Sequence, residues 1–317
     1  MRLVVAGSPA AAVPTLRRLA ASEHEIAAVL TRPPTPQGRK RVLTPTPVAV
    51  VAGELGLPVI EAVRVDDEVT DRIEALRVDL GVIVAYGALL RRRALDAPRH
   101  GWVNLHFSAL PAYRGAAPVQ RAVIAGDTTT AASVFQLVEA LDAGPVFAAT
   151  PFPIEPEATA GEVLAAMAGI GARTVVDVVD AIADGTAVGI EQVGTPTLAP
   201  KTTTEDGHVR FERPARVVHA QVRGVTPEPG AFAFAGPTRV KLLRVALLPP
   251  VETRTGGTAS ITADLAPGAL RLIDARLVVG TADGAVELVE VQPAGGKPMP
   301  GSAWARGLGD LGGVVLS

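Results

Sequence analysis

Cysteine is absent from the 317 residues of this chain, and aromatic side chains make up only 3% of them. The first absence excludes disulfides, thiol nucleophiles and metal sites held by cysteine. The second means that a core must be built from Ala, Val and Leu, for which a hydrophobic fraction of 48% is ample. The sequence therefore predicts a folded protein rather than a disordered one, without thiol chemistry.

Long apolar runs are missing as well. The longest, Leu80–Leu90, is far shorter than the roughly 20 residues that a membrane-spanning helix needs. The start of the chain is interrupted at Gly7 and Pro9, and it lacks the basic and long apolar regions of a signal peptide. We therefore expect a soluble, cytoplasmic protein.

Neither sign of charge dominates, because 30 Lys and Arg residues face 32 Asp and Glu residues and leave a net charge of −2. Such a balance does not point to a nucleic-acid binder, so any contact with nucleic acid must use local patches. Five scattered histidines without cysteine also offer no cluster of metal ligands. We expect no metal.

Short apolar runs alternate with helical patterns through the first 150 residues, which predicts an α/β fold with a mostly parallel, Rossmann-like sheet. Strands are expected at Arg2–Ala6, Ile26–Leu30, Leu80–Ala85, Trp102–His106, Ser133–Val138 and Val146–Thr150. Helices are expected at Ala11–Ala21, Pro47–Leu55, Asp67–Leu76 and Ala160–Ala183.

The character of the chain changes after residue 183. Residues 184–206 are polar and rich in Thr, Gly and Pro, which is typical of a linker. Beyond them, short strand-like runs separated by Gly, Pro and Asp favour a small β-barrel. We therefore predict a catalytic domain at 1–183, a linker at 184–206 and a barrel domain at 207–317.

One segment of the first domain, Arg32–Pro47, does not fit the alternation. It holds five prolines and three consecutive basic residues, Arg39, Lys40 and Arg41, so a helix or a central strand is excluded. A loop of this length inside a compact domain is usually functional or disordered. A solvated surface excursion is the alternative.

Candidate chemistry lies where the strand at 102–106 ends. Asn104 and His106 share one face of that strand, and ligands bind outside the carboxyl ends of parallel strands. An amide can hold a carbonyl oxygen, and an imidazolium can stabilise negative charge or move a proton. A turn further along supplies the carboxylate of Asp142, although an Asp in a turn often serves only as a hydrogen-bond acceptor.

These features are specific in combination. The pattern N-x-H-x-S, followed by LPxYRGAAP and then LDAG, resembles the folate-dependent formyltransferases, and among them the methionyl-tRNA formyltransferases. The opening GSPxxAVPxL, the basic segment TRPPTPQGRKRVLTPTPV and the run VIVAYGALL also match, so the resemblance covers essentially the whole chain. It implies the formyltransferase fold followed by an OB-like barrel that binds tRNA.

The activity that this resemblance implies is transfer of the formyl group of 10-formyltetrahydrofolate to the α-amine of methionyl initiator tRNA, for translation initiation. The family's catalytic residues fall on Asn104, His106 and Asp142. Folate contacts are implied at Val84, Ala85, Tyr86, Gly87, Ser108, Ala109, Leu110 and Pro111. The tRNA contacts are implied at Arg39, Lys40 and Arg41. We expect a monomer that has folate and charged initiator tRNA as partners and needs no membrane.

The match is imperfect at several positions, among them Ser8 and Lys40, where the family has threonine and glycine. The family's GLDTG is ALDAG here, with Ala140 and Ala143, and its aromatic and tryptophan positions hold Ala11 and Glu228. None of these positions belongs to the catalytic trio. The changes at Ala11 and Glu228 concern peripheral contacts with the acceptor.

A mechanism follows from the residue types. The α-amine has a pKa of about 7.7–8.0, so a base needs to remove few protons from it near neutral pH. Hydrogen-bond donors aimed at the developing oxyanion therefore matter most. We hypothesise that Asn104 and a protonated His106 are those donors, and that Asp142 orients His106, raises its pKa and relays the amine proton.

Two other readings stay open. One is a formyltransferase for a small-molecule acceptor, or a 10-formyltetrahydrofolate hydrolase, against which the basic segment and the barrel count. The other is an inactive folate- or RNA-binding module, against which the presence of the complete trio counts.

Overall fold

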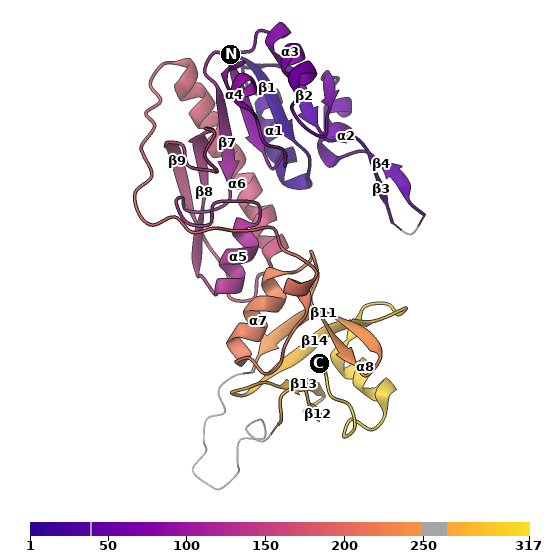
Figure 1. The fold of residues 1–317 in the computed structure, drawn as a ribbon. Coiled ribbons are helices and arrows are strands. Elements are labelled where there is room, and N and C mark those ends of the chain that lie inside the picture. The colour runs from indigo at the N-terminus through magenta and orange to yellow at the C-terminus, as the bar shows by residue number, and fades with distance from the viewer. Residues whose placement is uncertain (39, 249–264) are drawn as a thin grey trace. The chain divides into compact units, whose positions relative to one another are not determined.

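The computed structural model describes residues 1–38, 40–248 and 265–317, and the chain forms two compact units (Figure 1). The first unit combines residues 1–118, 129–153 and 164–200. The second combines residues 119–128, 154–163 and 201–317. Residues 184–200 thus pack with the first unit.

The first unit is built on a seven-stranded sheet in the order β5-β2-β1-β6-β7-β8-β9. The pairs from β5 to β7 are parallel, and β8 and β9 are added antiparallel. The predicted mostly parallel α/β fold is confirmed. The strands are β1 (Arg2–Gly7), β2 (Glu25–Thr31), β5 (Val59–Glu61), β6 (Leu80–Val84), β7 (Trp102–His106), β8 (Thr129–Gln136) and β9 (Val146–Pro153).

The helices connect these strands, and local sequence signals set where several of them begin. Thr46 caps the first turn of one helix by accepting a hydrogen bond from Ala49 N at 3.0 Å, and Asp66 caps the next through Val69 N. The helices are α1 (Val13–Ala20), α2 (Pro47–Glu54), α3 (Asp67–Ala75), α4 (Arg92–Asp96), α5 (Pro118–Ala125) and α6 (Ala160–Ala183). No helix within the described ranges is long and apolar enough to cross a membrane.

The centre of the sheet is fixed by one close contact. A Cβ atom at Gly81 of β6 would lie 2.1 Å from the ring of Trp102 on β7, so only glycine leaves room for the indole. The Trp102 ring is fully buried, and its Nε1 donates to Ala94 O at 2.7 Å. This packing fixes the start of the strand whose other end carries Asn104 and His106.

The proline-rich segment forms a short hairpin rather than an irregular loop. Strand β3 (Thr35–Gln37) pairs antiparallel with β4 (Val42–Thr44), and all six residues are exposed. Figure 1 shows the hairpin extending away from the sheet. Lys40 and Arg41 lie on its turn and are exposed, whereas Arg39 lies outside the described residues.

The second unit is an antiparallel sheet in the order β10-β11-β14-β13-β12, with β15 paired to β14. Residues 315–317 make bridges or hydrogen bonds with both outer regions, at residues 234–235 and at 268–269, so the sheet curls as the predicted barrel requires. The elements are α7 (Ala215–Gly224), β10 (Phe232–Ala235), β11 (Thr238–Leu247), β12 (Leu270–Ile273), β13 (Arg276–Gly280), β14 (Ala285–Pro293), β15 (Met299–Pro300) and α8 (Gly301–Leu308).

Candidate active site

The three expected catalytic side chains converge on one cavity of the first unit. Asn104 and His106 reach it from β7, and Asp142 reaches it from the turn after β8. The cavity measures about 440 Å³, which is within the roughly 300–1,000 Å³ of typical small-molecule sites. It opens where β6 and β7 end, as expected for a parallel sheet.

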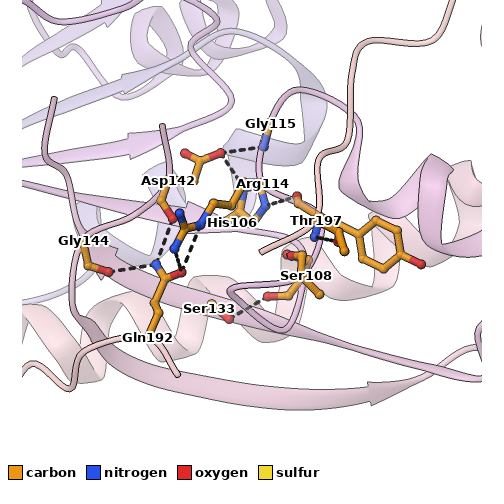
Figure 2. Close-up of polar contacts among 11 residues, drawn as sticks. His106, Ser108, Arg114, Gly115, Ser133, Asp142, Gly144, Gln192 and Thr197 are labelled. Carbon is orange, nitrogen blue, oxygen red and sulfur yellow. Dashed lines mark hydrogen bonds and ion pairs between the residues drawn. The ribbon is translucent and has the colours of Figure 1, made fainter. Parts of the chain in front are cut away.

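The hydrogen bonds of His106 determine which ring nitrogen is free. The side chain is only 5% exposed, and Nε2 lies 2.8 Å from Tyr113 O. A carbonyl only accepts, so Nε2 carries the proton and Nδ1 keeps its lone pair. Nδ1 lies 3.7 Å from Asp142 Oδ2, too far for a hydrogen bond but close enough for a strong charge interaction (Figure 2).

The charge of His106 differs from the expected one. Burial lowers the pKa of His106, and this effect outweighs the Asp142 carboxylate and the Tyr113 carbonyl, which both raise it. The imidazole is therefore neutral at pH 7 in the free protein. This direction runs against the hypothesis of a protonated His106, because desolvation of the ring outweighs the attraction of one carboxylate at 3.7 Å.

Asp142 is held in an unusual backbone conformation. Its φ is +45°, in the left-handed region that costs a non-glycine residue about 1–2 kcal/mol. Oδ2 accepts a hydrogen bond from Gly115 N at 2.8 Å. Gly115 has a φ of +125°, and a Cβ there would meet Ala199 O at 2.8 Å. The loop before α5 thus needs glycine at the position that holds the carboxylate.

Asn104 offers an unsatisfied amide oxygen at the cavity. Its Oδ1 is buried and has no hydrogen-bond partner among the described residues. Leaving such an atom unpaired costs about 1–3 kcal/mol. The same amide carries two N–H donors. Asn104 can therefore accept from one ligand group and donate to another.

Only part of the first set of implied folate contacts lies on the cavity wall. Ala85, Tyr86 and Gly87 line it, whereas Val84 is fully buried and does not. The Tyr86 hydroxyl donates to Ala62 O at 2.8 Å, and burial raises the pKa of Tyr86. Since its hydroxyl is engaged, Tyr86 contributes to the wall rather than to polar recognition.

The second set, Ser108–Pro111, does not line the cavity within the described structure. The Ser108 hydroxyl donates to Ala112 O at 2.6 Å, and the Ser108 carbonyl accepts from Ser133 Oγ at 2.6 Å. These bonds tie the loop after β7 back onto itself and onto β8 (Figure 2). Residues 108–111 therefore stabilise the loop that carries Tyr113 and Gly115.

Sequence reasoning missed most of the apolar wall and one entire segment. The wall also contains residues 88–90, which end the VIVAYGALL motif, and residues 137–141, which lead into the LDAG motif. The missed segment is 192–199. Thr197 Oγ1 accepts from Tyr113 N at 2.8 Å, and Gln192 bonds to three residues of the site. Its composition resembles a linker, so no local signal could have found it.

The wall fits a flat ligand that is largely apolar and polar at one end. Leu89, Val138 and Leu141 are exposed along it, and Asn104 also lines the cavity. A folate derivative can offer its flat p-aminobenzoyl ring to such a wall, and it carries polar groups on the pterin to one side of that ring and on the glutamate to the other. Among the described residues, no group of three His, Cys, Asp or Glu side chains could hold a metal ion.

Comparison with known proteins gives a consistent result. Residues 1–179 match the formyl transferase family model, and residues 201–309 match the formyl transferase C-terminal domain. A methionyl-tRNA formyltransferase of Clavibacter sepedonicus is 52% identical over 308 residues, which is 97% of each chain. A methionyl-tRNA formyltransferase of Pseudarthrobacter chlorophenolicus is 50% identical over the full length of both chains.

Solved structures share the fold at lower identity. An N-formyltransferase of Helicobacter canadensis, solved with folinic acid and dTDP-3-aminofucose, matches with a TM-score of 0.66 at 14% identity and covers 90% of this chain and 97% of its own. A methionyl-tRNA formyltransferase from Clostridium thermocellum matches with a TM-score of 0.58 at 14% identity, covering 78% of this chain and 94% of its own.

Proposed function

Because this chain belongs to the formyl transferase family, we propose that it transfers the formyl group of 10-formyltetrahydrofolate to the α-amine of methionyl initiator tRNA. The observation that carries the proposal is the convergence of Asn104, His106 and Asp142 on one cavity. Full-length identity of about 50% to methionyl-tRNA formyltransferases supports the choice of acceptor. Such a reaction belongs in the cytoplasm, where tRNA is charged.

The donor supplies an electrophilic formyl carbon, and the apolar wall of residues 85–90 and 137–141 would hold it beside the trio. Asn104 Nδ2 donates to the formyl oxygen as negative charge develops there. One such donor is typically worth roughly 3 kcal/mol. Asn104 Oδ1, which is buried and unpaired, accepts an N–H of the attacking amine and so orients its lone pair toward the carbon.

Proton movement falls to His106 and Asp142. The neutral imidazole presents its free Nδ1 as the base that takes the amine proton once the C–N bond forms. The imidazolium produced in this way lies 3.7 Å from the Asp142 carboxylate, which stabilises it. It then returns the proton to N10 of the donor as the bond from N10 to the formyl carbon breaks, so tetrahydrofolate leaves and the imidazole is neutral again. Asp142 therefore acts on the charged state that forms during the reaction. Tyr113 O fixes the tautomer throughout.

Contact with tRNA would use the exposed hairpin and the second unit. Lys40 and Arg41 lie on the turn of the β3–β4 hairpin, and we extend the proposal to Arg39, which lies outside the described residues. Their cationic side chains suit phosphates near the 3′ end of the acceptor. The curled antiparallel sheet of the second unit would hold the acceptor stem, and we expect the protein to act as a monomer.

A small amine acceptor is the second candidate, because the Helicobacter canadensis structure of similar fold was solved with an amino sugar nucleotide. The deciding experiment supplies labelled 10-formyltetrahydrofolate with methionyl initiator tRNA, methionyl elongator tRNA or an amino sugar nucleotide. We expect label on the initiator tRNA, and loss of it in Asn104→Ala. Label on the sugar alone, or none on any acceptor, would overturn the proposal.

A further inference from the structure

Gln192 binds the turn that carries Asp142 from a segment 50 residues further along the chain. Its Nε2 donates to Asp142 O at 2.8 Å and to Gly144 O at 2.9 Å. Its Oε1 accepts from Arg114 Nη2 at 2.6 Å and from Arg114 Nε at 3.2 Å (Figure 2). One side chain therefore satisfies four hydrogen bonds and joins both loops that flank the imidazole of His106.

These partners allow only one orientation of the amide. Carbonyls only accept and a guanidinium only donates, so exchange of Nε2 and Oε1 would break every contact at once. The segment around Gln192 is also fixed by its backbone. Ile190 pairs with Val146, and Leu198 bridges to Arg114. The amide is therefore held in place before any ligand binds.

The turn needs such support because of its geometry. Asp142 has a φ of +45°, and only Gly115 N among the described groups donates to its carboxylate. The neighbouring Gly144 lies so close to Gln136 O that a Cβ would be 1.9 Å away. Apart from the two bonds from Gln192, no hydrogen bond from a described residue restrains the carbonyls of Asp142 and Gly144.

We propose that Gln192 is a positioning residue for the formyl transfer, which sets the carboxylate of Asp142 against His106 by donating to the carbonyls of Asp142 and Gly144. This inference rests on the proposed function. It concerns the bonds that Gln192 donates, not those that it accepts. Arg114 serves to hold the amide in the donating orientation.

The chain contains a matched control in its second unit. Gln221 also donates its Nε2 to two backbone carbonyls, Asp206 O and His208 O, both at 2.9 Å. Gln192→Glu and Gln221→Glu make the same isosteric change and remove the same kind of bond. Only the first lies beside the cavity. A difference between them therefore reports on position rather than on lost stability.

The experiment measures kcat, KM for each substrate, and Tm for the wild type and both variants. We expect Gln192→Glu to lower kcat at least tenfold with less than threefold change in KM for 10-formyltetrahydrofolate, and Gln221→Glu to stay within twofold of wild-type kcat.

Gln192→Ala repeats the test if the glutamate variant does not fold. A wild-type kcat in a folded Gln192 variant, or equal losses at both sites, would overturn the inference. A wild type that forms no formylmethionyl-tRNA would instead overturn the proposed function, and this inference with it.

Discussion

The turn that carries Asp142 and the basic β3–β4 hairpin are built in opposite ways. Hydrogen bonds from Gly115 and Gln192 meet at the turn, and Asp142 is only 8% exposed. On the hairpin, the side-chain hydrogen bonds of Gln37 and Thr44 stay within the hairpin, and Lys40 and Arg41 form no ion pair with a described residue. The reacting groups are preorganised, whereas the cationic groups are free to meet a large partner.

This difference separates two kinds of effect. Changes at the turn and the cavity should act on the chemical step and appear in kcat. Changes on the hairpin should act on encounter and binding, and appear in KM for tRNA and in its dependence on salt. Substitutions in the two regions should therefore affect different steps of the reaction.

Asn104→Ala is expected to have the largest effect. It removes both the donor for the formyl oxygen and the buried acceptor for the amine, so kcat should fall by about 10²–10³-fold. Steady-state kinetics at saturating tRNA would measure this loss. An unchanged kcat would show that the amide does not face the reacting atoms, and would remove the main support for the site.

The three candidate residues could be predicted from the sequence because each lies in a recognisable motif. Asn104 and His106 lie in the motif at the end of a strand, and Asp142 lies in the LDAG turn. The charge of His106 could not, since it depends on how deeply the ring is buried among side chains from distant segments. Gln192 could not either. Its segment looks like a linker, and its role arises only through contacts with residues 48 to 78 positions away.

The implied folate contacts show the same limit. Ala85–Gly87 lie on the wall, but the side chain of Ser108 bonds within its own loop and the Ser108–Pro111 segment does not line the cavity. A sequence motif identifies a segment of the site. It does not show whether the segment contacts the ligand or supports neighbouring residues. In the fold, by contrast, short apolar runs marked the central strands correctly because parallel strands are buried on both faces.

Asp142→Asn should change the titration of His106 in a predictable direction. The Asp142 carboxylate raises the pKa of His106 against the larger effect of burial, so removing its charge should lower that pKa further. The acid limb of the pH dependence of kcat should move to lower pH. The value of kcat should also fall, because the His106 imidazolium loses the carboxylate that stabilises it. NMR titration of the His106 ring nitrogens gives the pKa directly. An upward shift would contradict the assigned electrostatics.

Replacing both Lys40 and Arg41 by Ala should have a moderate effect, confined to tRNA binding. We expect KM for tRNA to rise several-fold at 100 mM salt while kcat stays within twofold. The slope of log KM against log salt should shrink by about 1.5, because each phosphate contact contributes roughly 0.7–0.9. Kinetics across a salt series test this, and an unchanged slope would mean that the hairpin does not meet phosphates.

The smallest effect is expected from His219→Gln in the second unit, and it concerns stability. Burial lowers the pKa of His219 more strongly than Glu157 raises it, and Arg223 lowers it as well. The unfolded chain therefore binds a proton below about pH 6.5 that the folded chain does not, so stability falls on acidification. The variant should reduce this slope, by at most about 1.4 kcal/mol per pH unit.

Because His219 lies outside the cavity, His219→Gln should keep wild-type kcat at pH 7 and the wild-type acid limb. It therefore serves as a control for Asp142→Asn. Denaturant melts between pH 5 and pH 7 measure the slope. An acid limb that moved in His219→Gln would indicate that partial unfolding, and not the titration of His106, sets the pH profile.

The most direct test of the separation between chemistry and encounter is the single-turnover rate of formyl transfer, with protein in excess over methionyl-tRNA and at saturating concentration. For Asn104→Ala, the rate constant should fall at least 100-fold. For the variant in which Lys40 and Arg41 are both Ala, it should remain within twofold of the wild type. Equal slowing in the two variants, or a wild-type rate in Asn104→Ala, would contradict the account.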